Sequence, residues 1–247
     1  MNDFKDIEYD TLSNQYINEL FKYFNQCFIF FEYENFITDN IVESRTLKKN
    51  TKHILNFEDE EIKILMDEMS CQKSKDIFKV GLFTGMRISE IANLKNKNID
   101  FKDKIITITD SKTKSGIRKI PIHNQILSIF KNYITDNSDS LVFDSSVNQL
   151  TKLMDRRIKK VINITGKSFH STRKNFTQKL YELEQKDKIK ENTIKRLLGH
   201  SNKDNFSFEV YNLNKIDIDI LKESINLIEY KYFLNVDMKD NNIILSF

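Results

Sequence analysis

Residues 81–94 read GLFTGMRISEIANL, and the apolar spacing around them predicts a helix that ends at Gly85 and a short second helix after it. Glycine permits the tight turn between the two helices because it has no side chain. The turn exposes Arg87, and Glu90 lies one helical turn further on, where its carboxylate can brace a nearby basic group. Taken alone, these two residues fit an ordinary surface ion pair as well as a functional site.

The composition narrows the fold class. The chain has 247 residues, 39% of them hydrophobic, and contains only five glycines and one proline. This apolar fraction suffices for the core of one large domain, or of one domain with a small appendage. β-Sandwiches, barrels and Rossmann-type folds need many glycine turns, so the scarcity of glycine argues against them. We therefore predict a mainly α-helical fold.

A short stretch in the middle of the chain changes period. Alternating apolar residues predict two strands, 104–109 and 117–122, which form an antiparallel hairpin joined by residues 110–116. Pro121 cannot donate a ladder hydrogen bond, so its strand is expected at an edge of this small sheet. Apolar steps of three and four residues predict the helices, which cover residues 10–36 (one or two helices), a stretch from about 57, 74–84, 88–95, 124–135, 147–164, 171–184, 191–198, 205–213 and 216–230.

The chain divides into three parts by pattern. Residues 1–53 form a short helical N-terminal segment that runs into a polar linker. Residues 54–230 form the main domain, and residues 231–247 form a tail that could be a hairpin or a docking element.

Charge is distributed unevenly, although the net charge is only +3. Residues 1–50 hold five Lys and Arg against nine Asp and Glu, whereas residues 151–203 hold fifteen against five. A basic block with a helical pattern indicates a polyanionic partner. The alternative is a solvated face in a chain whose composition favours Lys, Asn and Ile throughout.

Membrane and secretory classes are not expected. The longest apolar run, Cys27–Phe31, is far shorter than the roughly 18 residues of a membrane span, and no signal-peptide pattern opens the chain. Two cysteines cannot make a disulfide scaffold, which favours a reducing compartment. We expect no membrane partner, and either a cytoplasmic, nucleoid-associated location or a viral or mobile-element origin.

Two further motifs carry candidate functional residues. His170 and Arg173 lie at i and i+3 on one face of a predicted helix, where two donors suit a phosphate. Gly199 stands at a predicted helix C-cap, His200 begins the loop after it, and Tyr211 follows on the next predicted helix. Each motif is weak by itself, since such pairs and capping histidines also arise by chance.

The order of these motifs resembles that of the tyrosine recombinases, the integrase family that includes phage integrases and chromosome-dimer resolvases. The resemblance covers roughly residues 54–230 and implies the family's catalytic domain, a mainly α fold with a small antiparallel sheet. It assigns catalytic roles to Arg87, Lys114, His170, Arg173, His200 and Tyr211, with Glu90 in support. Lys114 lies in the predicted hairpin, where the family carries a catalytic lysine, and Lys112 is the alternative because hairpin registers slip by one or two residues.

The resemblance also implies a chemistry. A site-specific recombinase or integrase of this family cleaves and rejoins DNA through a 3′-phosphotyrosine intermediate, without metal or other cofactor. The two arginines would bond the non-bridging phosphate oxygens. Tyr211 would attack the phosphorus, and Lys114 would protonate the departing 5′ oxygen. His170 would help to deprotonate the tyrosine or hold the phosphate, and His200 would donate to a non-bridging oxygen.

Double-stranded DNA is the partner that the resemblance implies, held by basic residues that contact the backbone without reading sequence. The candidates for these contacts are Lys112, Lys152, Arg156, Arg157, Lys159, Lys160 and Lys174. The resemblance further implies a homo-oligomer, a tetramer on DNA that exchanges its C-terminal helix between protomers. Packing of this helix in its own chain is the alternative.

Two departures from the family pattern keep other functions open. His200 and Tyr211 are eleven residues apart, a longer step than is usual in the family. Residues 1–53 are shorter and more acidic than the family's DNA clamp, and fit a reduced clamp, an interaction module or a truncated remnant. The alternative functions are a type IB topoisomerase or telomere resolvase with the same chemistry, and a catalytically silent DNA-binding factor derived from the family.

Overall fold

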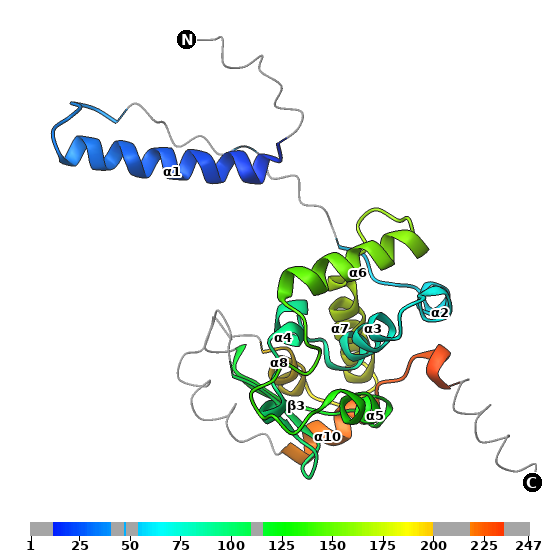
Figure 1. Cartoon of the computed structure of the whole chain (residues 1–247). Coiled ribbons are helices and arrows are strands. Elements are labelled where there is room, and N and C mark those ends of the chain that lie inside the picture. The colour runs from blue at the N-terminus through cyan, green and yellow to red at the C-terminus, as the bar shows by residue number, and fades with distance from the viewer. Residues whose placement is uncertain (1–11, 41–46, 48–53, 110–115, 200–217, 235–247) are drawn as a thin grey trace, which may run out of the picture. The chain divides into compact units, whose positions relative to one another are not determined.

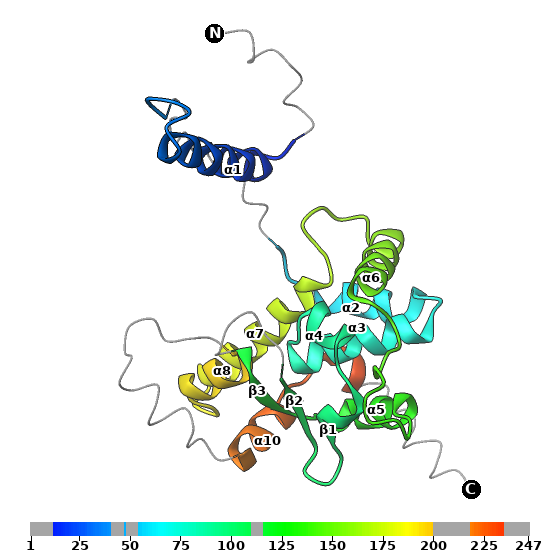
Figure 2. The same ribbon diagram turned by 60° about the vertical axis from the view of Figure 1, so that its left-hand side comes forward.

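The structure is a computed structural model that describes residues 12–40, 47, 54–109, 116–199 and 218–234. The chain divides into two compact units, residues 1–53 and residues 54–247. Figures 1 and 2 show the second unit as a group of helices around a small sheet. The predicted class, mainly α with a small antiparallel sheet, is therefore confirmed.

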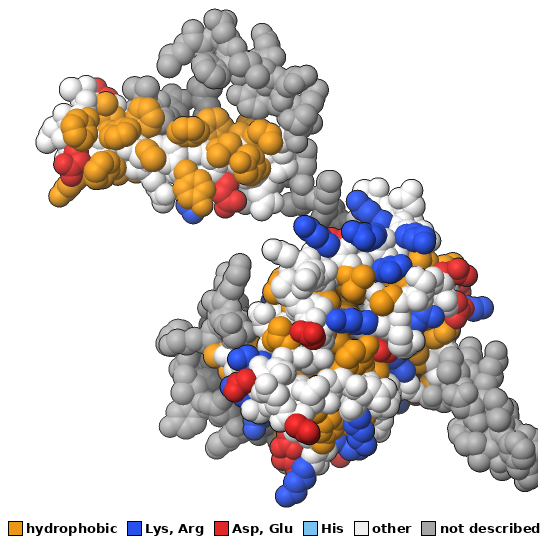
Figure 3. All heavy atoms as spheres, viewed as in Figure 1, with side chains coloured by type: hydrophobic (Ala, Val, Ile, Leu, Met, Phe, Trp, Pro, Cys, Tyr) orange, Lys and Arg blue, Asp and Glu red, His pale blue; other side chains and the backbone are white. Residues whose placement is uncertain are grey.

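The first unit contains one long helix, α1 (Asn14–Tyr33). Its N-cap is Ser13, whose hydroxyl accepts a hydrogen bond from the backbone N–H of Tyr16, as helix N-caps commonly do. Asn18 bonds both backbone groups of Leu47, which fixes that residue beside the helix. Large apolar side chains on this unit remain exposed (Figure 3), namely Tyr16, Tyr23, Phe24, Ile29, Phe30, Phe31, Tyr33 and Phe36.

The second unit contains the other α-helices found among the described residues. They are α2 (Asp59–Glu68), α3 (Gln72–Thr84), α4 (Ile88–Ala92), α5 (Leu127–Tyr133), α6 (Val147–Val161), α7 (His170–Glu184), α8 (Glu191–Leu198) and α10 (Ile218–Asn226). Every predicted helix that falls on described residues is present. The helix predicted over 205–213 lies outside the described residues, and so does every residue of the tail after Leu234.

The sheet has three antiparallel strands in the order β1 (Ile99–Asp100), β2 (Ile105–Ile108) and β3 (Arg118–Pro121). The predicted hairpin corresponds to β2 and β3, although residues 110–115 between them lie outside the described part of the chain. Pro121 ends the edge strand β3, as expected for a residue without a ladder donor. Sequence analysis missed β1, because two residues are too few to show an alternating pattern.

Two glycines end helices in the left-handed conformation that side chains disfavour. Gly85 closes α3 with φ of 61°, and Gly199 closes α8 with φ of 64°. Both stops were predicted from the sequence. They matter for the site because one precedes Arg87 and the other follows Leu198.

The core of this unit lies around α3, which packs side by side with α7 (Figures 1 and 2). Residues Ile77, Phe78, Val80, Leu82 and Phe83 of α3 are all buried. Gly81 lies so close to the start of α7 that a Cβ there would sit 2.6 Å from Phe169 and 2.7 Å from the Thr172 hydroxyl. Helix α3 therefore needs glycine at this position for its close approach to α7.

Gly81→Ala tests this close approach, since alanine normally stabilises a helix interior by about 1 kcal/mol over glycine. Here we expect the opposite sign, because overpacking a buried site costs about 1–3 kcal/mol. The urea midpoint of unfolding should fall in the variant and partly recover when Phe169→Leu makes room. A midpoint that rises in Gly81→Ala would contradict the close packing of α3 and α7.

Candidate active site

Arg87 is the N-cap of helix α4 and comes directly after the glycine turn, and the Glu90 side chain reaches back to it. The Glu90 carboxylate accepts from the backbone N–H of Arg87 at 2.8 Å and from its guanidinium Nη1 at 3.0 Å. The Arg87 side chain is 43% exposed, whereas that of Glu90 is 5% exposed. The brace expected from the sequence is therefore present, and it leaves the outer side of the Arg87 guanidinium open to solvent.

A second arginine, Arg118 of β3, holds the same carboxylate from the buried side. Its Nη1 and Nη2 donate to the two oxygens of Glu90, each at 3.0 Å. Its Nε donates to the carbonyl of Leu197 and its Nη1 also to that of Gly116, again at 3.0 Å each. The Arg118 side chain is 0% exposed, so every one of these bonds is shielded from water.

Sequence analysis missed Arg118. A signal was available, since strand alternation places residues 118, 120 and 122 on one face, and both Ile120 and Ile122 are buried. An arginine on such a face has to be paired with a carboxylate or with backbone carbonyls. The alternation does not identify the carboxylate that pairs with Arg118.

The ionisation of Glu90 follows from these contacts. Burial alone would raise the pKa of its carboxyl group. The hydrogen bonds and charge of Arg118, together with the Arg87 backbone N–H and charge, outweigh burial and hold this pKa below its ordinary value. Glu90 is therefore a fixed anion between two guanidinium groups at neutral pH.

Arg173 comes from the first turn of α7 and is buried. Its Nη1 donates to the Gly85 carbonyl at 2.7 Å, and its Nη2 donates to the Leu198 carbonyl at 2.6 Å. Burial, followed by the charges of Arg87 and Arg118, lowers the pKa of Arg173 to about 10. The Arg173 guanidinium stays protonated at neutral pH, and its charge is repelled by the charges of Arg87 and Arg118.

His170 is the first residue of α7 and lies one helical turn before Arg173. Partial burial of the imidazole lowers its pKa, and the charges of Arg173, Arg87 and Lys174 lower it further. The imidazole is therefore neutral at neutral pH and able to accept a proton. The sequence-predicted residues Arg87, Glu90, His170 and Arg173 are thus brought together from two separate motifs.

The cluster carries excess positive charge. Within the described part of the chain, Glu90 is the one carboxylate that forms an ion pair with Arg87 or Arg118, and Arg173 is held by carbonyls. Three guanidinium groups against one carboxylate favour an anion at the exposed side of Arg87. Phosphate and sulfate groups suit such a cluster because guanidinium forks match their oxygens.

Three predicted catalytic residues, Lys114, His200 and Tyr211, lie outside the described residues, as does Lys112, the alternative to Lys114. Their roles stay predictions. The described residues beside them do belong to the cluster, since Gly116 follows the hairpin loop and accepts from Arg118. Leu198, two residues before His200, accepts from Arg173.

Helix α6 presents most of the basic residues predicted to contact DNA. Leu150, Met154 and Ile158 bury one side of the helix. Lys152, Arg156, Lys159 and Lys160 are exposed, and Figure 3 shows Lys and Arg side chains gathered over this helix. Arg157 donates to the Ser70 hydroxyl at 2.9 Å, and Lys174 on α7 donates to the Ile54 carbonyl at 2.6 Å.

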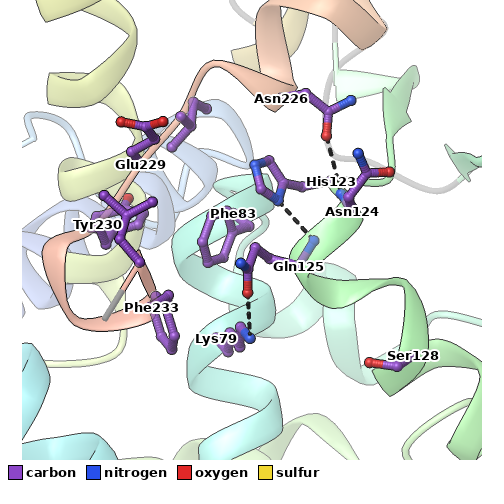
Figure 4. Close-up of a pocket in the computed structure, with 12 residues that line it drawn as sticks. Lys79, Phe83, His123, Asn124, Gln125, Ser128, Asn226, Glu229, Tyr230 and Phe233 are labelled. Atoms are coloured by element: carbon purple, nitrogen blue, oxygen red, sulfur yellow. Dashed lines mark hydrogen bonds between the residues drawn. The ribbon is translucent and has the colours of Figure 1, made fainter. Parts of the chain in front are cut away.

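A separate pocket of about 540 Å³ lies under the residues that follow α10 (Figure 4). Its polar groups bond one another, since Lys79 donates to Gln125 at 3.0 Å and the Asn124 N–H donates to Asn226 at 3.1 Å. It contains none of the predicted site residues. Over the described ranges, no group of three or more His, Cys, Asp or Glu is arranged to hold a metal, and no helix is long and apolar enough to cross a membrane.

Comparison with known proteins gives a family match. The model of the phage integrase family matches residues 52–215, more than half of the chain. A XerC-like tyrosine recombinase of Caldanaerobacter subterraneus subsp. tengcongensis is 26% identical over 197 residues, covering 63% of this chain and 49% of that protein. The XerA tyrosine recombinase of Pyrococcus furiosus is 30% identical over 154 residues, covering 58% of this chain and 52% of its own. This chain spans about half the length of these relatives.

Solved structures share the fold. The Tn1549 transposon integrase in complex with circular intermediate DNA superposes with a TM-score of 0.60 at 21% identity, over 78% of this chain and 73% of that one. A lambda integrase dimer bound to a COC′ core site superposes with a TM-score of 0.57 at 21% identity, over 76% and 56% respectively. Identities this low speak for the fold alone.

The charges around His170 make its pKa a reporter of anion binding. The charge of sulfate does not change over the pH range in which histidine titrates. We expect bound sulfate to raise the pKa of His170, because the anion offsets the positive charges of Arg87 and Arg173. By linkage, sulfate should then bind more tightly as the pH falls through that pKa. NMR titration of the imidazole with and without sulfate measures the effect, with His170→Gln to assign the signal.

Arg87→Gln serves as the matched control in this titration. Removing the charge of Arg87 should raise the pKa of His170 without any anion and weaken the further rise on adding sulfate. A pKa that is the same in both proteins and insensitive to sulfate would mean that no anion binds beside His170.

Proposed function

Because this chain belongs to the phage integrase family, we propose that it is a site-specific DNA recombinase that cleaves and rejoins DNA through a 3′-phosphotyrosine intermediate. The substrate is double-stranded DNA, and residues 54–230 supply the catalytic part. The observation that carries the proposal is the arginine cluster. Arg87 and Arg118 share one carboxylate, Arg173 lies beside them, and Arg87 opens to solvent near a neutral His170.

The phosphate-binding step falls to Arg87 and Arg173. In the proposal they donate charge-assisted hydrogen bonds to the non-bridging oxygens of the scissile phosphate, where negative charge builds up during attack. Arg173 is already held by two carbonyls, which lowers the cost of ordering it on binding. Glu90 keeps Arg87 in place without approaching the phosphate itself.

The covalent step uses residues whose roles rest on the sequence. The Tyr211 oxygen forms a bond to phosphorus while the bond from phosphorus to the 5′ oxygen breaks. His170 takes the tyrosine proton, since its imidazole is neutral at neutral pH and can accept one. Lys114, or Lys112 in the alternative register, gives a proton to the 5′ oxygen, and His200 donates to a non-bridging oxygen. No metal takes part in this proposed scheme.

An oligomer on DNA belongs to the same proposal. Helix α10 packs in its own chain, where Leu221 and Ile225 are buried. In the proposal, the C-terminal helix is exchanged between protomers in a tetramer on DNA, with packing of this helix in its own chain as the alternative.

The decisive test uses a nicked suicide duplex, which traps the covalent adduct because the short strand diffuses away. Tyr211→Phe should bind the duplex as wild type does and form no adduct, since it lacks the attacking oxygen. Denaturing gels measure the adduct, and fluorescence anisotropy measures binding. An adduct that persists in this variant would remove Tyr211 from the role. A wild-type protein that binds the duplex but forms no adduct would instead support the alternative, a catalytically silent DNA-binding factor.

Salt dependence tests the proposed binding of DNA by α6. The triple variant Arg156→Gln, Lys159→Gln and Lys160→Gln should flatten the plot of log affinity against log salt by about 0.9 for each phosphate that it no longer neutralises. Lys131→Gln, an exposed lysine on α5, is the control and should leave the slope unchanged. A triple variant with the wild-type slope would exclude these residues from the interface.

A further inference from the structure

Arg118 joins three parts of the site by a single guanidinium group. It bonds Glu90 of α4, Gly116 at the end of the hairpin loop, and Leu197 at the end of α8. We infer that Arg118 is a positioning residue for Arg87, on which it acts through Glu90. This inference rests on the proposed function for its catalytic consequence.

The carboxylate of Glu90 has no freedom to turn. Its Oε1 accepts from Nη1 of Arg87 and from Nη1 of Arg118, each at 3.0 Å. Its Oε2 accepts from the backbone N–H of Arg87 at 2.8 Å and from Nη2 of Arg118 at 3.0 Å. Each oxygen therefore accepts from both arginines, so Arg118 fixes the position of the carboxylate that bonds the backbone N–H and the guanidinium of Arg87.

The remaining bonds of Arg118 place this pair relative to the two loops. Gly116 directly follows the hairpin loop that holds Lys112 and Lys114, and its carbonyl accepts from Arg118. Leu197 lies three residues before His200, and its carbonyl accepts from Nε. Four of the five N–H donors of a guanidinium are thereby used within the protein. The same group sets where each loop leaves the cluster.

Direct contact with DNA is not the role of Arg118, since its side chain is 0% exposed. A purely stabilising role is a poor explanation as well, because a buried ion pair often contributes no more than an apolar pair of the same size. What an apolar pair cannot do is hold Arg87 in one orientation. Lysine cannot replace Arg118 either, since an ammonium lacks the planar fork that grips both oxygens.

Two variants separate positioning from stabilisation in the full chain. Arg118→Met removes the charge and the fork, and Arg118→Lys keeps the charge and removes the fork. For each, the rate of adduct formation is measured at saturating suicide duplex, alongside duplex affinity and the thermal midpoint. Asn96→Ala is the matched control, because Asn96 is buried and its side chain bonds Thr135 and Asn137, which lie outside the cluster.

Positioning predicts a loss of rate without a loss of binding. The adduct rate per folded molecule should fall about 100-fold in Arg118→Met, as for a catalytic group displaced by about 1 Å, with duplex affinity nearly unchanged. Arg118→Lys should recover little of that rate. Asn96→Ala should lower the thermal midpoint and leave the rate per folded molecule as in wild type. A folded Arg118→Met or Arg118→Lys variant with the wild-type rate would overturn the inference, and the lysine variant decides if the methionine variant does not fold.

A second readout does not depend on recombination. NMR of the carboxyl carbon of Glu90 reports its pKa, which is held low mainly by Arg118. This pKa should rise in Arg118→Met, because burial remains while the hydrogen bonds and charge are gone. An unchanged pKa would show that Arg118 does not act on Glu90 and would overturn the inference. A wild-type protein that forms no adduct would refute the proposed function, and the pKa of Glu90 would then decide the role of Arg118 alone.

Discussion

The carboxylate of Glu90, shared between Arg87 and Arg118, is the constraint on which the site depends. A charge that is 5% exposed is costly unless it is paired and fully hydrogen-bonded. Satisfying it requires the start of α4 to meet the start of β3, and the carbonyl bonds of Arg118 add the end of α8. Three segments from different parts of the chain are thereby brought to one place, where they hold the exposed guanidinium of Arg87.

Local chemistry explains why much of this was predictable from the sequence. Gly85 and Gly199 end helices through their own backbone freedom, and the pair His170 and Arg173 share a face because of helix geometry. The alternation around Arg118 indicates a buried, paired arginine but not its role, because the carboxylate that it pairs with lies 28 residues away and no local pattern identifies it. Strand β1 was missed for a different reason, since two residues carry no periodicity.

Two kinds of packing support the cluster. The pair of α3 and α7 is held by close contact at Gly81, which sets the position of Phe169 and hence the start of α7. The polar side is held by backbone carbonyls and one carboxylate, so it carries a net positive charge while Arg118 and Arg173 are anchored by hydrogen bonds inside the protein. A buried group with satisfied bonds can keep its charge available for an anion that arrives from solvent.

The hydrogen bonds of Arg173 determine when its part of the cluster can assemble during synthesis of the chain. Its guanidinium donates to the carbonyl of Gly85 and to that of Leu198, so its two partners come from an early and a late part of the chain. During synthesis, a nascent chain whose Leu198 has not yet left the ribosome lacks one of these two carbonyl partners. Fragments cut between these two residues lack one of them as well. Incomplete products of translation or proteolysis therefore lack at least one of the two carbonyls that hold Arg173.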